Sequence, residues 1–339
     1  MGDIRNLALT AALAGICVTV GVAGCALFQN EQVSRGKDLY AHYCSHCHGE
    51  SGRQNEGYNW EAMPDPRPKD LSNKDEMSTF KDEEIFETIS RDMKDTSPNG
   101  DKIGDDEFAV PTMPTFKYTL SEEEIWSIVA YVRTLHGMKL TFKVEERKNE
   151  LQGRLQDAQQ KFDQAKQVAE DAEKKANEEA EKKDVEVDDA AFAKEEQAMA
   201  AAAKELTKAK DEVANFTARP KFAAIPRLDL TSTPDATAQL AEVGKRLYSN
   251  KYGCNGCHKV GEDGGKVGPE LDRAGFRLNP TWVYRWVRYP QAMKPETRMP
   301  NLGLSDADAK AVTMYLTTLR APRQDGPATG TKPMEKASN

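Results

Sequence analysis

The chain has 339 residues, of which 38% are hydrophobic and 30% are charged, and its formal net charge is −8. This length suggests about two domains. The mean hydropathy of −0.71 excludes a membrane protein with several spans, and the negative charge argues against a general nucleic-acid binder. The charge is uneven: residues 31–139 contain 13 Lys and Arg against 22 Asp and Glu, whereas residues 219–339 contain 19 against 12. An acidic front half is therefore joined to a basic back half.

Residues 1–24 have the features of a secretory signal peptide. The apolar run from Leu7 to Ala23 is shorter than the roughly 20 residues that span a bilayer, and it ends in small residues. Its end, Val22-Ala23-Gly24-Cys25, resembles the bacterial lipobox. The resemblance implies cleavage before Cys25 and attachment of acyl chains such as palmitate to that cysteine, which would anchor the mature chain to a membrane of the cell envelope, outside the cytoplasm and facing the periplasm. An ordinary signal or an uncleaved anchor is the alternative.

Four other cysteines lie in two copies of one motif. The copies are Cys44-Ser45-His46-Cys47-His48 and Cys254-Asn255-Gly256-Cys257-His258. The pattern C-x-x-C-H is the attachment signature of c-type haem, in which both thiols bond to the porphyrin and the histidine ligates iron. A redox dithiol or half of a zinc site is the alternative, but zinc would need a second Cys/His pair in each region, and the sequence has none. The motifs predict two covalent haem c groups with His48 and His258 as proximal iron ligands.

A Met-Pro pair follows each motif. Met113 and Met299 each precede a serine, Ser121 or Ser305, that is followed by acidic residues and an apolar periodicity typical of a capped helix. This arrangement closely resembles that of class I cytochromes c, in which the distal methionine precedes the C-terminal helix. The resemblance covers about 31–139 and 236–320 and implies Met113 and Met299 as distal iron ligands. The alternatives are Met93 and Met293, or His42 in a bis-histidine haem.

Two further features repeat in step with the motifs. Gly36 and Tyr40 precede the first motif with the same spacing as Gly244 and Tyr248 precede the second. In the resembled family this segment is the N-terminal helix, whose glycine allows close packing on the C-terminal helix and whose aromatic residue fills the crossing. Gly268-Pro269 matches a family segment whose backbone carbonyl orients the proximal histidine. The first domain lacks that match.

Residues 143–217 separate the two domains. Their charged, Ala-rich composition also suits a disordered spacer, but two sets of apolar or Ala positions repeat with heptad spacing. The first set is Leu151, Leu155, Ala158, Phe162, Ala165, Ala169, Ala172 and Ala176; the second is Phe192, Met199, Ala202, Leu206, Ala209, Val213 and Phe216. Their phases differ, and one of the aspartates at the shift, Asp184, Asp188 or Asp189, could cap a new helix.

This phase change predicts an antiparallel hairpin with helices near 145–182 and 189–217. A single helix would extend about 110 Å and hold the haem domains apart, whereas a hairpin of ~40 to 55 Å returns the chain near its start. Only the hairpin makes direct transfer between the haems plausible.

Together these features predict an all-α fold: two cytochrome c-like helical domains at 31–139 and 236–320, separated by a coiled-coil helical hairpin. Residues 218–235 would form a linker and 321–339 a disordered tail. The expected function is electron transfer without a catalytic residue. Expected partners are redox proteins, such as a cytochrome b or quinol-oxidising complex, a terminal reductase or other cytochromes c, together with a coiled-coil partner for the hairpin. The rivals are a di-haem peroxidase and a haem-bearing subunit of a larger membrane respiratory complex.

Overall fold

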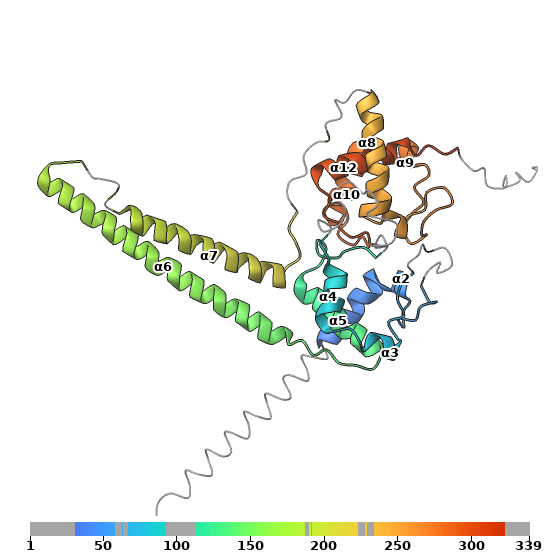
Figure 1. Ribbon diagram of the computed structural model, residues 1–339, viewed down its shortest axis with the longest axis horizontal. Helices are drawn as coiled ribbons and strands as arrows, with labels where there is room; N and C mark the ends of the chain where they lie inside the picture. The colour runs from blue at the N-terminus through green and yellow to red at the C-terminus, as the bar shows by residue number, and fades with distance from the viewer. Residues whose placement is uncertain are drawn as a thin grey trace, which may run out of the picture.

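The computed structural model of the protein describes residues 31–57, 63, 67–92, 113–186, 190, 192–222, 228 and 234–322. These residues form helices and loops, with no β-sheet among them. Two helical domains lie next to each other, and a long helical hairpin extends away from them (Figure 1). The predicted all-α fold with a hairpin between two domains is therefore confirmed. The signal segment with Cys25, as well as Met93, lies outside the described residues.

Domain one begins with a helix at 31–43 and continues through four others. These are α2 (Ser45–His48), α3 (Lys74–Met77), α4 (Asp82–Ser90) and α5 (Glu122–Leu135). The first helix crosses α5 at Gly36, where a Cβ atom would lie 1.8 Å from the carbonyl oxygen of Ser127. Tyr40 is 1% exposed and packs on Tyr131 at the same crossing, with 5.1 Å between ring centroids. Only glycine lets the two backbones approach this closely.

Domain two repeats this crossing. Its helices are α8 (Pro234–Arg246), the π-turn η4 (Leu247–Lys251), the 3-10 turn η5 (Cys254–Gly256), α9 (Ala274–Arg277), α10 (Pro280–Arg288), α11 (Pro290–Met293) and α12 (Asp306–Thr318). Gly244 meets α12, where a Cβ atom would lie 1.9 Å from the carbonyl oxygen of Ala311. Tyr248 packs on Tyr315 with 5.4 Å between ring centroids. The paired glycines and tyrosines therefore pack as the resemblance to class I cytochromes c implied.

Both C-terminal helices begin as expected from the sequence. The Ser121 hydroxyl accepts a hydrogen bond from the backbone of Glu124, whose side chain in turn accepts one from the Ser121 backbone at the start of α5. Ser305 accepts from the backbone of Asp308 at the start of α12. These caps satisfy amide groups that have no partner inside the helix, and they fix where the two methionine loops end.

The hairpin consists of α6 (Val144–Lys183) and α7 (Ala193–Thr217). The two helices run antiparallel, with Arg154 paired to Glu212 at 2.8 Å and Lys161 paired to Glu205 at 3.9 Å. All the positions of the two predicted heptad sets are buried or half-buried. Asp184 ends α6 in a left-handed conformation, with φ +52°. The expectation that one of the three aspartates caps the second helix is wrong, because the N-cap of α7 is Phe192. Asp184 instead ends α6, and Asp188 and Asp189 lie outside the described residues.

The base of the hairpin is part of domain one. Val144, Leu151 and Phe216 lie in the same hydrophobic core as Tyr40. The Glu124 carboxylate accepts a hydrogen bond at 2.9 Å from Nε of Arg219, just beyond α7. Both ends of the hairpin are thus fixed to one domain. No helix in the described part of the chain is long and apolar enough to cross a membrane.

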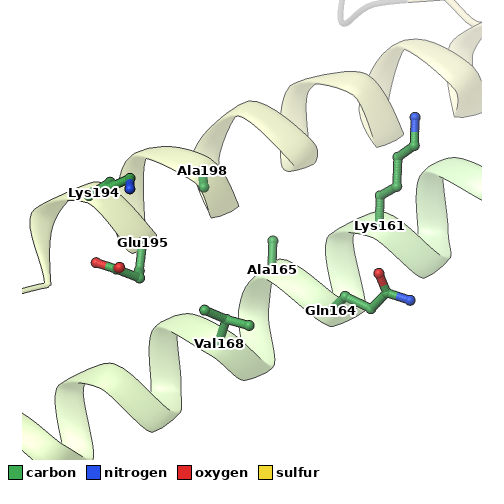
Figure 2. A pocket seen from close by; sticks show the side chains of 7 residues that line it. All are labelled: Lys161, Gln164, Ala165, Val168, Lys194, Glu195 and Ala198. Carbon is green, nitrogen blue, oxygen red and sulfur yellow. The ribbon is translucent and has the colours of Figure 1, made fainter.

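The hairpin is thinly packed where the middle of α6 faces the start of α7, because alanines fill its seam there. Val168, which follows Ala165 on α6, is 56% exposed. Figure 2 shows the open groove between the helices, with Ala165 of α6 and Ala198 of α7 directed toward each other. The groove is lined by Lys161, Gln164, Ala165, Val168, Lys194, Glu195 and Ala198.

Candidate functional site

The last four residues of the first motif, Ser45–His48, form the single helical turn α2. Cys44 precedes the helix and is 8% exposed within the core of domain one. Nδ1 of His48 lies 3.2 Å from the carbonyl oxygen of Lys69. A carbonyl can only accept, so Nδ1 carries the proton and Nε2 keeps its lone pair, as a proximal iron ligand requires. Desolvation lowers the pKa of His48, which also favours the neutral ring.

The second motif repeats this geometry. Nδ1 of His258 donates to the carbonyl oxygen of Pro269 at 2.8 Å, as the resemblance implied. A Cβ atom on Gly268 would lie 2.4 Å from Cε1 of His258, so only glycine fits beside the ring. Desolvation lowers the pKa of His258 as well. The corresponding carbonyl in domain one belongs to Lys69. It could not be predicted from the sequence, because every residue has a backbone carbonyl.

Each methionine loop meets the core that contains the motif of its own domain. Met113 packs against the same core as Cys44, and Met299 packs against the same core as Cys254. Met293 ends α11 and is not among the residues of that second core. Met77, which is 3% exposed, shares the first core with Met113. In each domain, the cysteine and the methionine that the sequence assigned to the haem therefore pack against the same hydrophobic core.

The backbone and sulfur of Met299 have defined partners. Nε2 of Gln291 donates to the Met299 carbonyl oxygen at 2.8 Å. The indole Nε1 of Trp286 donates to the Met299 sulfur Sδ at 2.9 Å. Trp286 is in turn stacked on Trp282, with 5.0 Å between ring centroids. These contacts hold the thioether in place within domain two.

The donor sets fit haem c. Burial raises the pKa of the Cys44 thiol and of the Cys254 thiol to about 12, so both remain thiols at neutral pH. Each domain then offers a cysteine thiol for a thioether bond to haem, a histidine with a free Nε2 and a methionine thioether. Among the described residues, no group of three or more His, Cys, Asp or Glu side chains is placed to hold a metal ion directly.

The two motifs face each other across the contact between the domains. The Cys47 and Cys257 side chains interact with each other, and this interaction lowers the pKa of Cys47 and raises that of Cys257. His46, inside the first motif, contacts the guanidinium of Arg298. His42 hydrogen-bonds to the backbone of Thr297, so this candidate ligand faces domain two.

Comparison with known proteins agrees with this geometry. The chain matches the family model described as Cytochrome c over residues 33–136 and 241–320. No match was found among curated proteins or among solved structures. Two helical domains with a haem-attachment motif each define a haem-binding electron-transfer protein. The chain belongs to the cytochrome c family.

Proposed function

We propose that this protein is a membrane-anchored electron-transfer protein located outside the cytoplasm, which carries two haem c groups and passes single electrons between respiratory partners. The observation that supports it is the repetition, in both domains, of a motif turn, a histidine engaged through Nδ1 and a methionine packed on the same core. Each haem, when bound, supplies an iron that alternates between Fe(II) and Fe(III) and so carries one electron.

The chain would hold the two haems with matching sets of residues. Cys44 and Cys47 would attach the first haem, and Cys254 and Cys257 the second. His48 and His258 would be the proximal ligands, and Met113 and Met299 the distal ones. With both axial positions filled, no site is open for a substrate, which favours electron transfer over bond-making chemistry.

The lipid anchor is proposed at Cys25. The apolar segment before it and its small-residue ending meet the requirements of lipoprotein processing. We expect the wild type and Cys17→Ala, which changes only the segment to be removed, to incorporate labelled palmitate and to begin at Cys25, whereas Cys25→Ala incorporates none. Mass spectrometry of the membrane-bound haem protein measures this, and an unacylated wild type or an acylated Cys25→Ala protein would contradict the anchor.

The hairpin is proposed as a docking or spacing arm for a helical partner. It extends from the haem domains (Figure 1) and carries an open groove between the middle of α6 and the first turns of α7. The expected redox partners are a cytochrome b or quinol-oxidising complex, a terminal reductase or another cytochrome c. The basic character of residues 219–339 favours an acidic surface for whichever partner contacts domain two.

A spectro-electrochemical titration of the purified mature protein tests the proposed function. We expect two covalent haems per chain, both low-spin when oxidised, each taking up one electron. A high-spin haem that reacts with peroxide would support the di-haem peroxidase instead. Stoichiometric co-purification with a cytochrome b or oxidase subunit would instead support a role as a haem-bearing subunit of a larger membrane respiratory complex.

A further inference from the structure

The loop that carries Met299 is held by domain one as well as by its own domain. The backbone N–H of Asn301 donates a hydrogen bond to Oγ1 of Thr119 at 2.8 Å. These residues are 182 positions apart in the chain, and they are 4% and 3% exposed. A buried amide that loses its only acceptor costs free energy, so Thr119 restrains the loop two residues after Met299.

The ring of Tyr118 restrains the same loop at Gly303. Gly303 has φ +69°, and a Cβ atom there would lie 2.4 Å from Cε2 of Tyr118. The Asn301 side chain accepts a hydrogen bond from the Gly303 backbone at 2.9 Å, which closes the turn. Tyr118 is held by its hydroxyl, which donates to Asp92 at 2.8 Å. The turn therefore lies against a fixed aromatic face of domain one.

The restraint comes from the methionine loop of domain one. Tyr118 and Thr119 follow Met113 by five and six residues, and they precede the cap of α5 at Ser121. The two methionine loops thus contact each other directly. In addition, Arg298, next to Met299, contacts His46 in the first motif.

We propose that Tyr118 and Thr119 of domain one are positioning residues for Met299, so that domain one sets the distal ligation of the haem in domain two. This inference rests on the proposed function, because it requires Met299 to ligate iron. A methionine thioether is a weak ligand carried on a long, flexible side chain. The bond between Met299 and iron would therefore depend on how firmly the Met299 loop is held. The contacts with Tyr118 and Thr119 therefore limit the conformations that the Met299 loop can adopt.

The test uses the full-length protein with both haems and the Thr119→Val variant, which removes the acceptor and keeps the side-chain shape. In the reduced protein, proton NMR shows high-field signals from each iron-bound methionine, and Met113→Ala and Met299→Ala assign them. We expect Thr119→Val to shift or remove the Met299 signals only. Imidazole should then bind the second haem about tenfold more tightly, as the loss of one buried hydrogen bond would give.

Two controls separate positioning from general destabilisation. Thr119→Ser retains the hydroxyl and should restore the Met299 signals. Thr313→Val removes a buried hydroxyl that donates to Ala309 within α12 and should leave those signals unchanged. Gly303→Ala, which forces the turn away from Tyr118, should reproduce the effect of Thr119→Val.

The outcomes distinguish this inference from the proposed function. Unchanged Met299 signals and imidazole affinity in Thr119→Val would overturn it, as would an equal change in Thr313→Val. If Met299→Ala itself left the spectrum unchanged, Met299 would not be the ligand, and both the ligand assignment and this inference would be wrong.

Discussion

Nε1 of Trp286 donates a hydrogen bond to the sulfur Sδ of Met299 at 2.9 Å. A donor at the sulfur withdraws electron density from the thioether, which favours Fe(II) over Fe(III) at the haem that Met299 would ligate. We therefore expect Trp286→Phe to lower the midpoint potential of the second haem. A net hydrogen bond of ~1 kcal/mol corresponds to about 40 mV for one electron.

Trp282→Phe is the matched control for this prediction. Trp282 stacks on Trp286 and is 40% exposed, but the hydrogen bond to Met299 comes from Trp286. Redox titration of both variants should show the shift in Trp286→Phe alone. Equal potentials in the wild type and Trp286→Phe would mean that the hydrogen bond does not tune the haem.

Removal of each distal methionine should alter one haem only. We expect Met113→Ala and Met299→Ala to retain both covalent haems, to lower the potential of the affected haem and to open it to added imidazole or cyanide. Met77→Ala and Met293→Ala are the controls, because Met77 shares the first core and Met293 lies close to Met299 in the sequence. A haem that opens in a control variant instead would reassign that ligand.

Asp82 should be a main source of stability in domain one. Its carboxylate is 2% exposed and pairs with Arg133, and it accepts hydrogen bonds from the backbone N–H groups of Thr141 and Phe142. Asp82→Asn leaves the Arg133 guanidinium without its anion, which for a buried pair costs about 3 to 5 kcal/mol. Urea unfolding, followed at the first haem, should show this loss, whereas the exposed Asp75→Asn should change little. A loss below about 1 kcal/mol would contradict the buried-pair assignment.

The same carboxylate predicts how stability depends on pH. Burial raises the pKa of Asp82, but hydrogen bonds from Thr141, Arg133 and Phe142 outweigh burial and hold the pKa below its usual value. The stabilisation is therefore fully present above the unfolded-state pKa of about 3.9 and is lost as the pH falls through the folded-state pKa. The urea midpoint of the wild-type protein should decrease as the pH is lowered through this range. The decrease should be smaller in Asp82→Asn. Parallel curves for the two proteins would contradict this role.

A variant with a shortened hairpin tests the role of the arm independently of the haem domains. Joining Arg154 to Glu212 through a short Gly-rich loop keeps Val144, Leu151 and Phe216, the hairpin residues that contribute to the core of domain one. We expect haem content and both potentials to stay unchanged, while recovery of a partner from membrane extracts is lost. Unchanged recovery of all partners would show that the arm does not dock one.

Local periodicity explains why much of this fold could be predicted from the sequence. Heptad spacing identified the hairpin seam, because helical neighbours recur every three or four residues. The resemblance to class I cytochromes c, carried by the repeated glycine and tyrosine, implied both helix crossings, and the structure shows them. The motif cysteines and histidines likewise carry their chemistry in a fixed local spacing.

Contacts between distant segments carry no such signal. The hydrogen bond between Thr119 and Asn301 joins an ordinary hydroxyl to a backbone amide of the other domain, so neither residue type marks it. The contact between the indole N–H of Trp286 and the Met299 sulfur is likewise not marked by residue type. Trp126, by contrast, is stacked between Phe86 and Phe142 in the core of domain one.

The antiparallel hairpin has adjustable length. Its base is fixed by core packing and by the bond between Arg219 and Glu124, whereas the distal part is held by a regular seam. One heptad added to each helix would move the tip outward by about 10.5 Å, at 1.5 Å per residue, and would preserve the facing register. The reach of the arm can therefore change, by insertion or deletion of paired heptads, without any change at the two haem sites.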